Sequence, residues 1–176
     1  MKSLFSEIPH LCSSRITVGE ITMQHAQGLY ELAHSQEVYR YLPTFLYEQQ
    51  HPDIGYVVRH LYDECWKDSI LLGVFAKGDF CGLAEFYGYR AEYHKVSVGY
   101  RLLQRWWGKG IASETLDLML RYLYGETDIE IITASTMVEN QASARVLTRN
   151  GFDLVTHGAL EDWGYPEPTV VDKWIR

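Results

Sequence analysis

A glycine-containing turn, Trp107-Gly108-Lys109-Gly110-Ile111-Ala112, lies where a strand pattern ends and an amphipathic helix pattern begins. Glycines let the backbone adopt left-handed conformations and approach a ligand closely, and the first N–H groups of a helix have no partner inside it. The helix dipole also favours an anion at that end. Three cations near in the sequence, Lys109, Arg105 and Arg101, could add positive charge. The turn therefore predicts a phosphate-binding site, with a tight turn that binds nothing as the alternative.

A second polar segment, Asn140-Gln141-Ala142-Ser143, follows the next apolar strand pattern and opens a short helix that Gly151 closes. Asparagine is a common helix N-cap, so on its own Asn140 explains no more than a helix start. Neither segment matches the Walker loop or the dinucleotide-binding fingerprint. The occurrence of both segments after successive strands nevertheless favours a ligand site over two unrelated turns.

The elements that position these segments follow from hydrophobic periodicity. Apolar residues at helical spacing predict helices over 23–33, 58–65, 112–123 and 141–150, and extended patterns predict strands over 15–20, 70–76, 80–87, 95–102, 129–137, 152–160 and 169–175. The strand–helix–strand unit from Lys95 to Met137 needs parallel neighbours, whereas the turn Lys77-Gly78-Asp79 joins antiparallel strands. We therefore expect an α/β fold of the α+β type, with a mixed, mostly antiparallel sheet flanked by helices, in one domain over residues 1–176.

Composition and charge narrow the functional classes. The chain has 176 residues, of which 47% are hydrophobic and 22% charged, values typical of a globular protein. Its net charge of -7 has the wrong sign for binding nucleic acid or an anionic membrane surface. No apolar run is long enough to span a membrane and the N-terminus lacks a secretory pattern, so we expect a cytoplasmic protein. The three cysteines, Cys12, Cys65 and Cys81, lack metal-ligand spacing and are predicted to be buried thiols, with no metal site.

Together the two segments resemble the GNAT superfamily of acyl-CoA N-acyltransferases. The family's acyl-CoA motif, Q/R-x-x-G-x-G/A, aligns on Trp107-x-x-Gly110-x-Ala112, and we prefer this register to Arg105-x-x-Gly108-x-Gly110 because it places Gly110 and Ala112 at the helix start. The second family signature, N-x-x-S/A ending in G-F, aligns on Asn140, Ser143, Gly151 and Phe152. The Trp-Trp-Gly-Lys-Gly form is typical of the ribosomal-protein N-acetyltransferase branch, RimJ and RimL among it.

The resemblance implies an N-acetyltransferase that uses acetyl-CoA as cosubstrate. The acceptor would be a primary amine: a protein N-terminus, an amino acid, a polyamine or another small amine. The enzyme would be a monomer or a homodimer. The backbone of Tyr100 to Leu102 would pair with the pantetheine arm, and an amide near Leu102 would face the thioester oxygen. The cosubstrate-binding residues implied are Tyr100, Arg101, Leu102, Trp107, Gly108, Lys109, Gly110, Ile111, Ala112, Ser113 and Asn140.

The implied reaction is direct attack of the amine on the thioester. An alkyl ammonium has a pKa near roughly 10, so a base or a water chain must take its proton. Glu85, inside a predicted strand, is the candidate base, unless it faces solvent from a half-exposed strand. His94, Glu161 and Asp162 are further candidates. Ser143 is the candidate acid for the leaving sulfur, unless it is only a small residue that lets the cosubstrate approach.

Two departures from the family pattern keep a second interpretation open. Leu147 stands where many members have a tyrosine acid, and Ser97 replaces a glutamate that is common in this branch. A thiol with a pKa near roughly 8.5 can leave without much acid help, so chemistry does not require that tyrosine. The alternative is a catalytically inactive CoA-binding sensor or interaction protein on the same fold.

Two further groups have open roles. Arg145 and Arg149 are four residues apart on the short helix and could reach CoA phosphates or form a solvated face with Glu139. Four aromatic residues cluster after the first helix, where relatives form the acceptor wall. A hydrophobic lid or a dimer patch is the alternative for this cluster. Its members are Tyr39, Tyr41, Phe45 and Tyr47.

Overall fold

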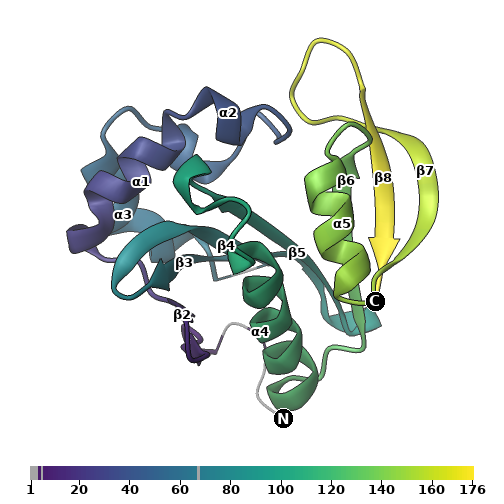
Figure 1. The fold of residues 1–176 in the computed structure, drawn as a ribbon, viewed down its shortest axis with the longest axis horizontal. Coiled ribbons are helices and arrows are strands. Elements are labelled where there is room, and N and C mark those ends of the chain that lie inside the picture. Colours follow the sequence, from purple (N-terminus) through teal and green to yellow (C-terminus); the bar gives the residue numbers. More distant parts are fainter. Residues whose placement is uncertain (1–3, 5, 67) are drawn as a thin grey trace.

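The computed structural model describes Leu4, residues 6–66 and residues 68–176. The strands of this part of the chain form one sheet in the order β1-β2-β3-β4-β5-β6-β8-β7. Every neighbouring pair is antiparallel except β5 and β6, which are parallel. The strands are β1 (Leu11–Cys12), β2 (Ile16–Gly19), β3 (Ile70–Ala76), β4 (Asp79–Arg90), β5 (Lys95–Leu102), β6 (Ile131–Met137), β7 (Asp153–Glu161) and β8 (Thr169–Ile175), and the helices are α1 (Ala26–Ala33), α2 (Gln36–Tyr39), α3 (Ile54–Glu64), α4 (Ile111–Glu126) and α5 (Gln141–Arg149) (Figure 1).

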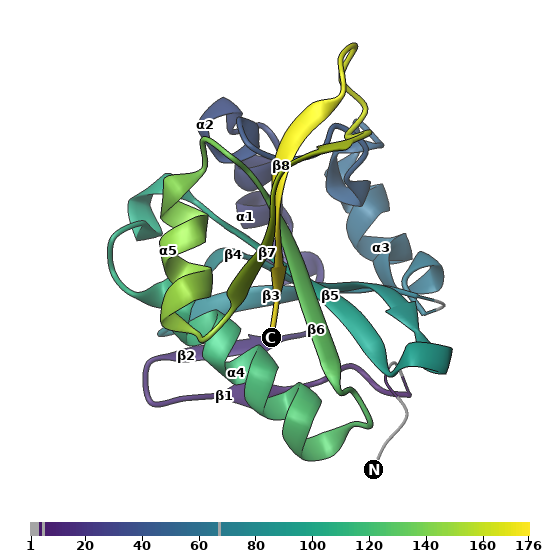
Figure 2. The same cartoon turned by 90° about the vertical axis from the view of Figure 1, so that its right-hand side faces the viewer.

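The first half of the sheet, β1 to β5, contains the main core. Every residue of β3 is buried, as expected for a strand that helices cover on both faces. Helices α1 and α3 lie on one face and α4 on the other (Figure 2). Along α4, buried Leu116, Met119 and Leu123 recur at helical spacing. At the edge of this half β5 ends and α4 begins.

The sheet opens between β5 and β6. The two strands pair only from Lys95 to Ser97 and from Ile131 to Thr133, and the hydroxyl oxygens of Ser97 and Thr133 lie 2.8 Å apart where the pairing ends. Beyond this point β5 stays with β4 and β6 stays with β8. Because α4 follows β5 and α5 follows β6, the N-termini of both helices lie beyond the diverging strand ends (Figure 1). Open α/β sheets bind ligands at such strand ends.

Most predicted elements are confirmed, and the mixed sheet is as expected. The bounds of β3, β5 and β8 agree with the prediction, whereas β4 continues to Arg90 and the short elements β1 and α2 are additional. The first predicted helix begins as a 3-10 turn, Met23–His25, with Thr22 as its N-cap. The turn between β3 and β4 has Lys77 and Gly78 in the left-handed region, with φ of 52° and 87°, which suits a two-residue hairpin turn.

The cysteine prediction is wrong in one place. Cys65 and Cys81 are buried, but Cys12 is exposed, because Leu11 rather than Cys12 faces the core from the short edge strand β1. Among the described residues, no helix is both long and apolar enough to cross a membrane. Within the same residues, no group of three His, Cys, Asp or Glu side chains is placed to hold a metal ion.

Candidate active site

Two cavities lie in the opening between β5 and β6. The first cavity, of about 410 Å³, is bounded by the end of β5, the turn before α4 and the helix α5. The second cavity, of about 800 Å³, is bounded by β4, β5, β6, β8 and the loop after α2. Since the two cavities have lining residues in common, a molecule in one can meet a molecule in the other. The shared residues are Tyr41, Leu42, Tyr100, Arg101, Asn140 and Ser143.

The glycine turn forms one wall of the first cavity. Gly108 and Gly110 have φ of 69° and 78°, a conformation that L side chains rarely adopt. Gly110 is the N-cap of α4, and the N–H of Glu114 donates to its carbonyl at 3.0 Å as the first helical bond. The N–H groups of Ile111, Ala112 and Ser113 therefore have no partner inside the helix. All three residues line the cavity, so the backbone offers a cradle for an anion.

The three cations predicted for this turn are directed elsewhere. Arg105 pairs with Glu31, the ammonium of Lys109 lies 5.0 Å from the centre of the Trp106 ring, and the guanidinium of Arg101 is buried between two carboxylates. Lys109 is also the one predicted cosubstrate-binding residue that does not line the first cavity. Each of these side chains therefore has a partner within the fold, and Arg101 is the one of the three that lines the first cavity.

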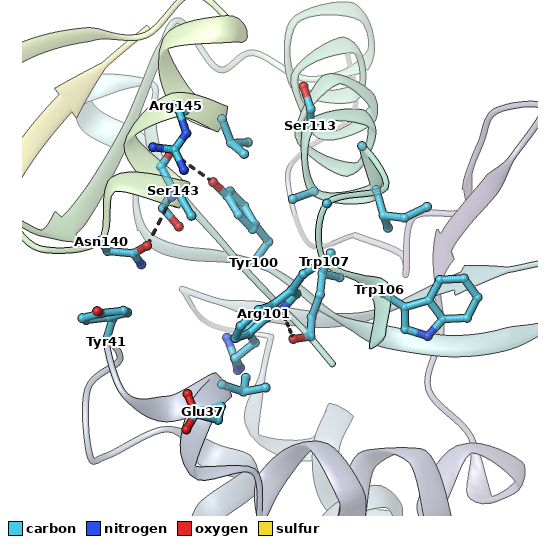
Figure 3. Close-up of a pocket in the computed structure, with 18 of the residues that line it drawn as sticks. Glu37, Tyr41, Tyr100, Arg101, Trp106, Trp107, Ser113, Asn140, Ser143 and Arg145 are labelled. Atoms are coloured by element: carbon cyan, nitrogen blue, oxygen red, sulfur yellow. Dashed lines mark hydrogen bonds between the residues drawn. The ribbon is translucent and has the colours of Figure 1, made fainter. Parts of the chain in front are cut away.

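Positive charge reaches the first cavity from the opposite wall. Arg145 and Arg149 of α5 both line it, and Figure 3 shows Arg145 on the helix across from the start of α4. Their four-residue spacing places both side chains on one face of α5. The sequence left two roles open for these arginines: contact with CoA phosphates, or a solvated face with Glu139. Their position on the cavity wall favours the first role.

The edge of β5 provides the floor of the first cavity. One edge of the strand pairs with β4 as far as Leu102, but the other edge has no strand beside it beyond Ser97 among the described residues. The indole N–H of Trp107 donates to the Leu102 carbonyl at 2.8 Å (Figure 3). Tyr100, Arg101 and Leu102 all line the cavity, and their pairing with the cosubstrate stays a prediction. An extended chain can therefore pair with this edge of β5 as an additional strand would. The carbonyl of Leu102 is not free for that pairing, because it already accepts the indole N–H of Trp107.

The start of α5 brings Asn140 and Ser143 to the place where the cavities meet. The Asn140 side chain accepts a hydrogen bond from the N–H of Ser143 at 3.2 Å, which makes it the N-cap. The hydroxyl of Tyr100 donates to the carbonyl of Ser143 at 3.5 Å (Figure 3). Burial raises the pKa of Tyr100, so its hydroxyl keeps its proton. The resemblance implied a role for the backbone of Tyr100 only, and no local pattern pointed to its side chain.

Glu85 lines the second cavity from β4. It lies opposite Gly99 of β5. The side chain is 20% exposed, and the Nη1 of Arg101 donates to Glu85 Oε2 at 2.9 Å. Burial raises the pKa of Glu85, and the negative charge of Glu48 adds to this while Arg101 opposes it. Glu85 is therefore not the solvent-facing strand residue of the alternative interpretation.

The other candidate bases differ in position. His94 is outside both cavities and its Nδ1 lies 3.2 Å from Asp128. Glu161 lines the second cavity, where it pairs with Lys173 and accepts the indole N–H of Trp163 at 2.8 Å. Asp162 does not line either cavity; its carboxylate accepts the N–H of Gly164.

The aromatic cluster is divided by the fold. Tyr41, Phe45 and Tyr47 line the second cavity, whereas Tyr39 turns inward and donates to Glu48. Hydrogen bonds tie this loop to the loop between β7 and β8. The N–H of Thr44 donates to the carbonyl of Trp163 at 2.9 Å, and the Tyr165 hydroxyl donates to the carbonyl of Leu42 at 2.8 Å. Both loops therefore close the same side of the second cavity.

Comparison with known proteins adds an independent line of evidence. Residues 15–153 match the family described as an acetyltransferase (GNAT) domain. The chain is 26% identical over 168 residues, 93% of each chain, to YoaA of Bacillus subtilis strain 168, which is named an uncharacterised N-acetyltransferase. It is also 34% identical over 76 residues, 43% of this chain and 39% of the other, to the ribosomal protein uS5-alanine N-acetyltransferase of Escherichia coli K12.

The fold has a close counterpart among solved structures. A structure of RimL, a ribosomal L7/L12 alpha-N-protein acetyltransferase in complex with coenzyme A, superposes with a TM-score of 0.79. The alignment covers 97% of each chain at 20% sequence identity. At this identity the likeness concerns the fold.

Proposed function

The chain belongs to the GNAT acetyltransferase family and is an N-acetyltransferase, and we propose that it transfers the acetyl group of acetyl-CoA to a primary amine across the junction of its two cavities. In this proposal the first cavity holds the cosubstrate and the second holds the acceptor. The observation that carries it is the set of residues shared by the two cavities, because group transfer needs the two reacting molecules in contact.

The residues of the first cavity fit acetyl-CoA. The left-handed glycines and the free N–H groups at the start of α4 suit a pyrophosphate. Arg145 and Arg149 add positive charge on the facing wall. The free edge of β5 suits an amide-containing pantetheine arm, which leads from the phosphate cradle toward Tyr100 and Ser143. When bound, the cosubstrate supplies an activated acetyl group.

Glu85 in the second cavity and Ser143 at the junction share the proton transfers in this proposal. Glu85 takes the first proton from the acceptor ammonium, since burial raises its pKa and so makes it a stronger base than an ordinary glutamate. The amine nitrogen then attacks the acetyl carbon to form a tetrahedral oxyanion, and the carbon–sulfur bond breaks as this oxyanion collapses. The second proton that the nitrogen loses passes to the sulfur, so coenzyme A leaves as a thiol. In this proposal Ser143 relays that proton to the sulfur, and the neighbouring Tyr100 hydroxyl, which donates to the Ser143 carbonyl, supports it. An amide near Leu102 stabilises the oxyanion.

The acceptor class that we test first is a protein N-terminus. Two of the similar proteins are named for the acetylation of ribosomal proteins. The second cavity is large enough for more than an amino group, and its wall includes aromatic Tyr41, Phe45 and Tyr47. Polyamines, amino acids and other small amines are the other acceptors to compare.

The test is acetyl-CoA-dependent release of thiol across a panel of amines at near-neutral and mildly alkaline pH. The panel contains a peptide that begins with alanine, the same peptide with a blocked N-terminus, polyamines and free amino acids. We expect turnover with the free peptide and none with the blocked one. Absence of thiol release with every amine would contradict the proposal if calorimetry shows that the protein binds acetyl-CoA. That result would favour an inactive CoA-binding protein.

A further inference from the structure

We propose that Glu48 is a positioning residue that takes two of the three donor nitrogens of Arg101 and neutralises its charge, so that Glu85, which keeps a single hydrogen bond from that guanidinium, stays available to accept the proton of the acceptor amine. The proposal deepens the proposed function, because it rests on Glu85 as the base. Glu48 belongs to a short 3-10 helix, Tyr47–Gln49, in the loop that lines the second cavity. Nothing in the local sequence sets it apart from the other carboxylates of the chain.

The geometry is that of one guanidinium between two unequal carboxylates. The Nε and Nη2 of Arg101 both donate to Glu48, the latter at 2.9 Å, whereas only Nη1 donates to Glu85. The Tyr39 hydroxyl also donates to Glu48. The side chains of Arg101 and Glu48 are 4% and 0% exposed, and that of Glu85 is 20% exposed toward the second cavity. Glu48 thus has three donors and no solvent, while Glu85 has one and faces the acceptor.

The charges follow from this asymmetry. Hydrogen bonds to the charged form of a carboxylate favour that form, and a second carboxylate near the same cation is disfavoured. Burial raises the pKa of Glu48, but Arg101 and Tyr39 outweigh burial and leave it lowered, whereas burial and Glu48 raise the pKa of Glu85. With Glu48 ionised, Arg101 is already neutralised. A proton that arrives from an acceptor amine therefore goes to Glu85.

The other groups around Glu85 do not disturb this balance. Burial raises the pKa values of Tyr87 on β4 and of Tyr39, so both stay neutral. On the far walls of the second cavity Glu161 pairs with Lys173. Asp68 and Lys95, of opposite charge, line the cavity as well. The charges of Arg101 and Glu48 both act on Glu85: that of Arg101 lowers its pKa and that of Glu48 raises it.

The test is the pH profile of kcat/KM for Glu48→Gln, which removes the charge and keeps the shape. The charge of Arg101 then acts on Glu85 alone, so we expect the acidic limb of the profile to move to lower pH and the plateau to fall about tenfold, as for a weaker base. Tyr39→Phe is the matched control, because it perturbs the same carboxylate and loop but keeps the negative charge of Glu48. The acidic limb of its pH profile should stay at the wild-type pH. A folded Glu48→Gln protein with an unmoved limb overturns the proposal.

A second measurement does not depend on the folding of that variant or on turnover. In the wild-type chain labelled with carbon-13 at glutamate carboxyls, the Glu85 resonance is assigned by comparison with Glu85→Gln and titrated by NMR. We expect it to titrate above the range of exposed glutamates. Titration within or below that range overturns the role of Glu48. Failure of the proposed function is separate, since it shows as absence of turnover while this titration remains readable.

Discussion

The two cavities are built from different parts of the chain. The first cavity presents mostly backbone: a pair of left-handed glycines, the open end of α4 and the unpaired edge of β5. The second presents side chains, and its reactive carboxylate depends on a guanidinium and a second carboxylate that lie on other elements. A backbone site depends on local conformation, whereas a side-chain site depends on tertiary contacts. The two should therefore fail in different ways when single residues change.

The largest expected effect is on the backbone site. Gly110→Glu places a side chain at a φ of 78° and a negative charge beside the phosphate cradle, so we expect acetyl-CoA affinity to fall by about 1000-fold in calorimetry. The control is Gly78→Glu, at a φ of 87° in the turn between β3 and β4, which adds the same charge and backbone strain outside both cavities. Unchanged acetyl-CoA affinity in a folded Gly110→Glu protein would contradict the proposal that this turn binds the phosphates.

The next effect falls on the side-chain site and leaves the first cavity intact. Glu85→Gln removes the base, so we expect kcat to fall about 100-fold with acetyl-CoA affinity unchanged. Because the pKa of Glu85 is raised, wild-type activity should increase with pH through a range above that of ordinary glutamates, and the variant should lose this step. Glu92→Gln, on the exposed turn after β4, should behave as wild type. Wild-type kcat in Glu85→Gln would assign the base elsewhere.

The smallest effect tests which cations serve the first cavity. Arg145→Ala and Arg149→Ala should each weaken acetyl-CoA binding by about fivefold, with a loss that shrinks at high salt because the contacts are exposed. Arg105→Ala is the matched comparison, since Arg105 is nearer to the glycine turn in sequence but pairs with Glu31. If Arg105→Ala and Arg149→Ala lost acetyl-CoA affinity equally, α5 would not be the main source of positive charge for the first cavity.

Predictions from the sequence held where conformation is local. The bounds of β5, the start of α4 at Gly110 and the start of α5 at Asn140 all follow from patterns within a few residues. They were less informative where a side chain has a partner far away in the sequence: Arg105 pairs with Glu31 and Arg101 with Glu48. Cys12 is a smaller case, since the exposure of an edge strand depends on what packs beside it.

The sequence by itself determined the family, the mixed sheet and the backbone cradle, because glycine conformations, helix caps and apolar periodicity are properties of neighbouring residues. Only the tertiary structure decided which charges meet. Arg101 and Glu48 are 53 residues apart in the chain, and Arg101 and Glu85 are 16 apart, yet their contact sets the proton affinity of the candidate base. The physical reason is that electrostatic coupling depends on distance and burial in space, which no local pattern of residues records.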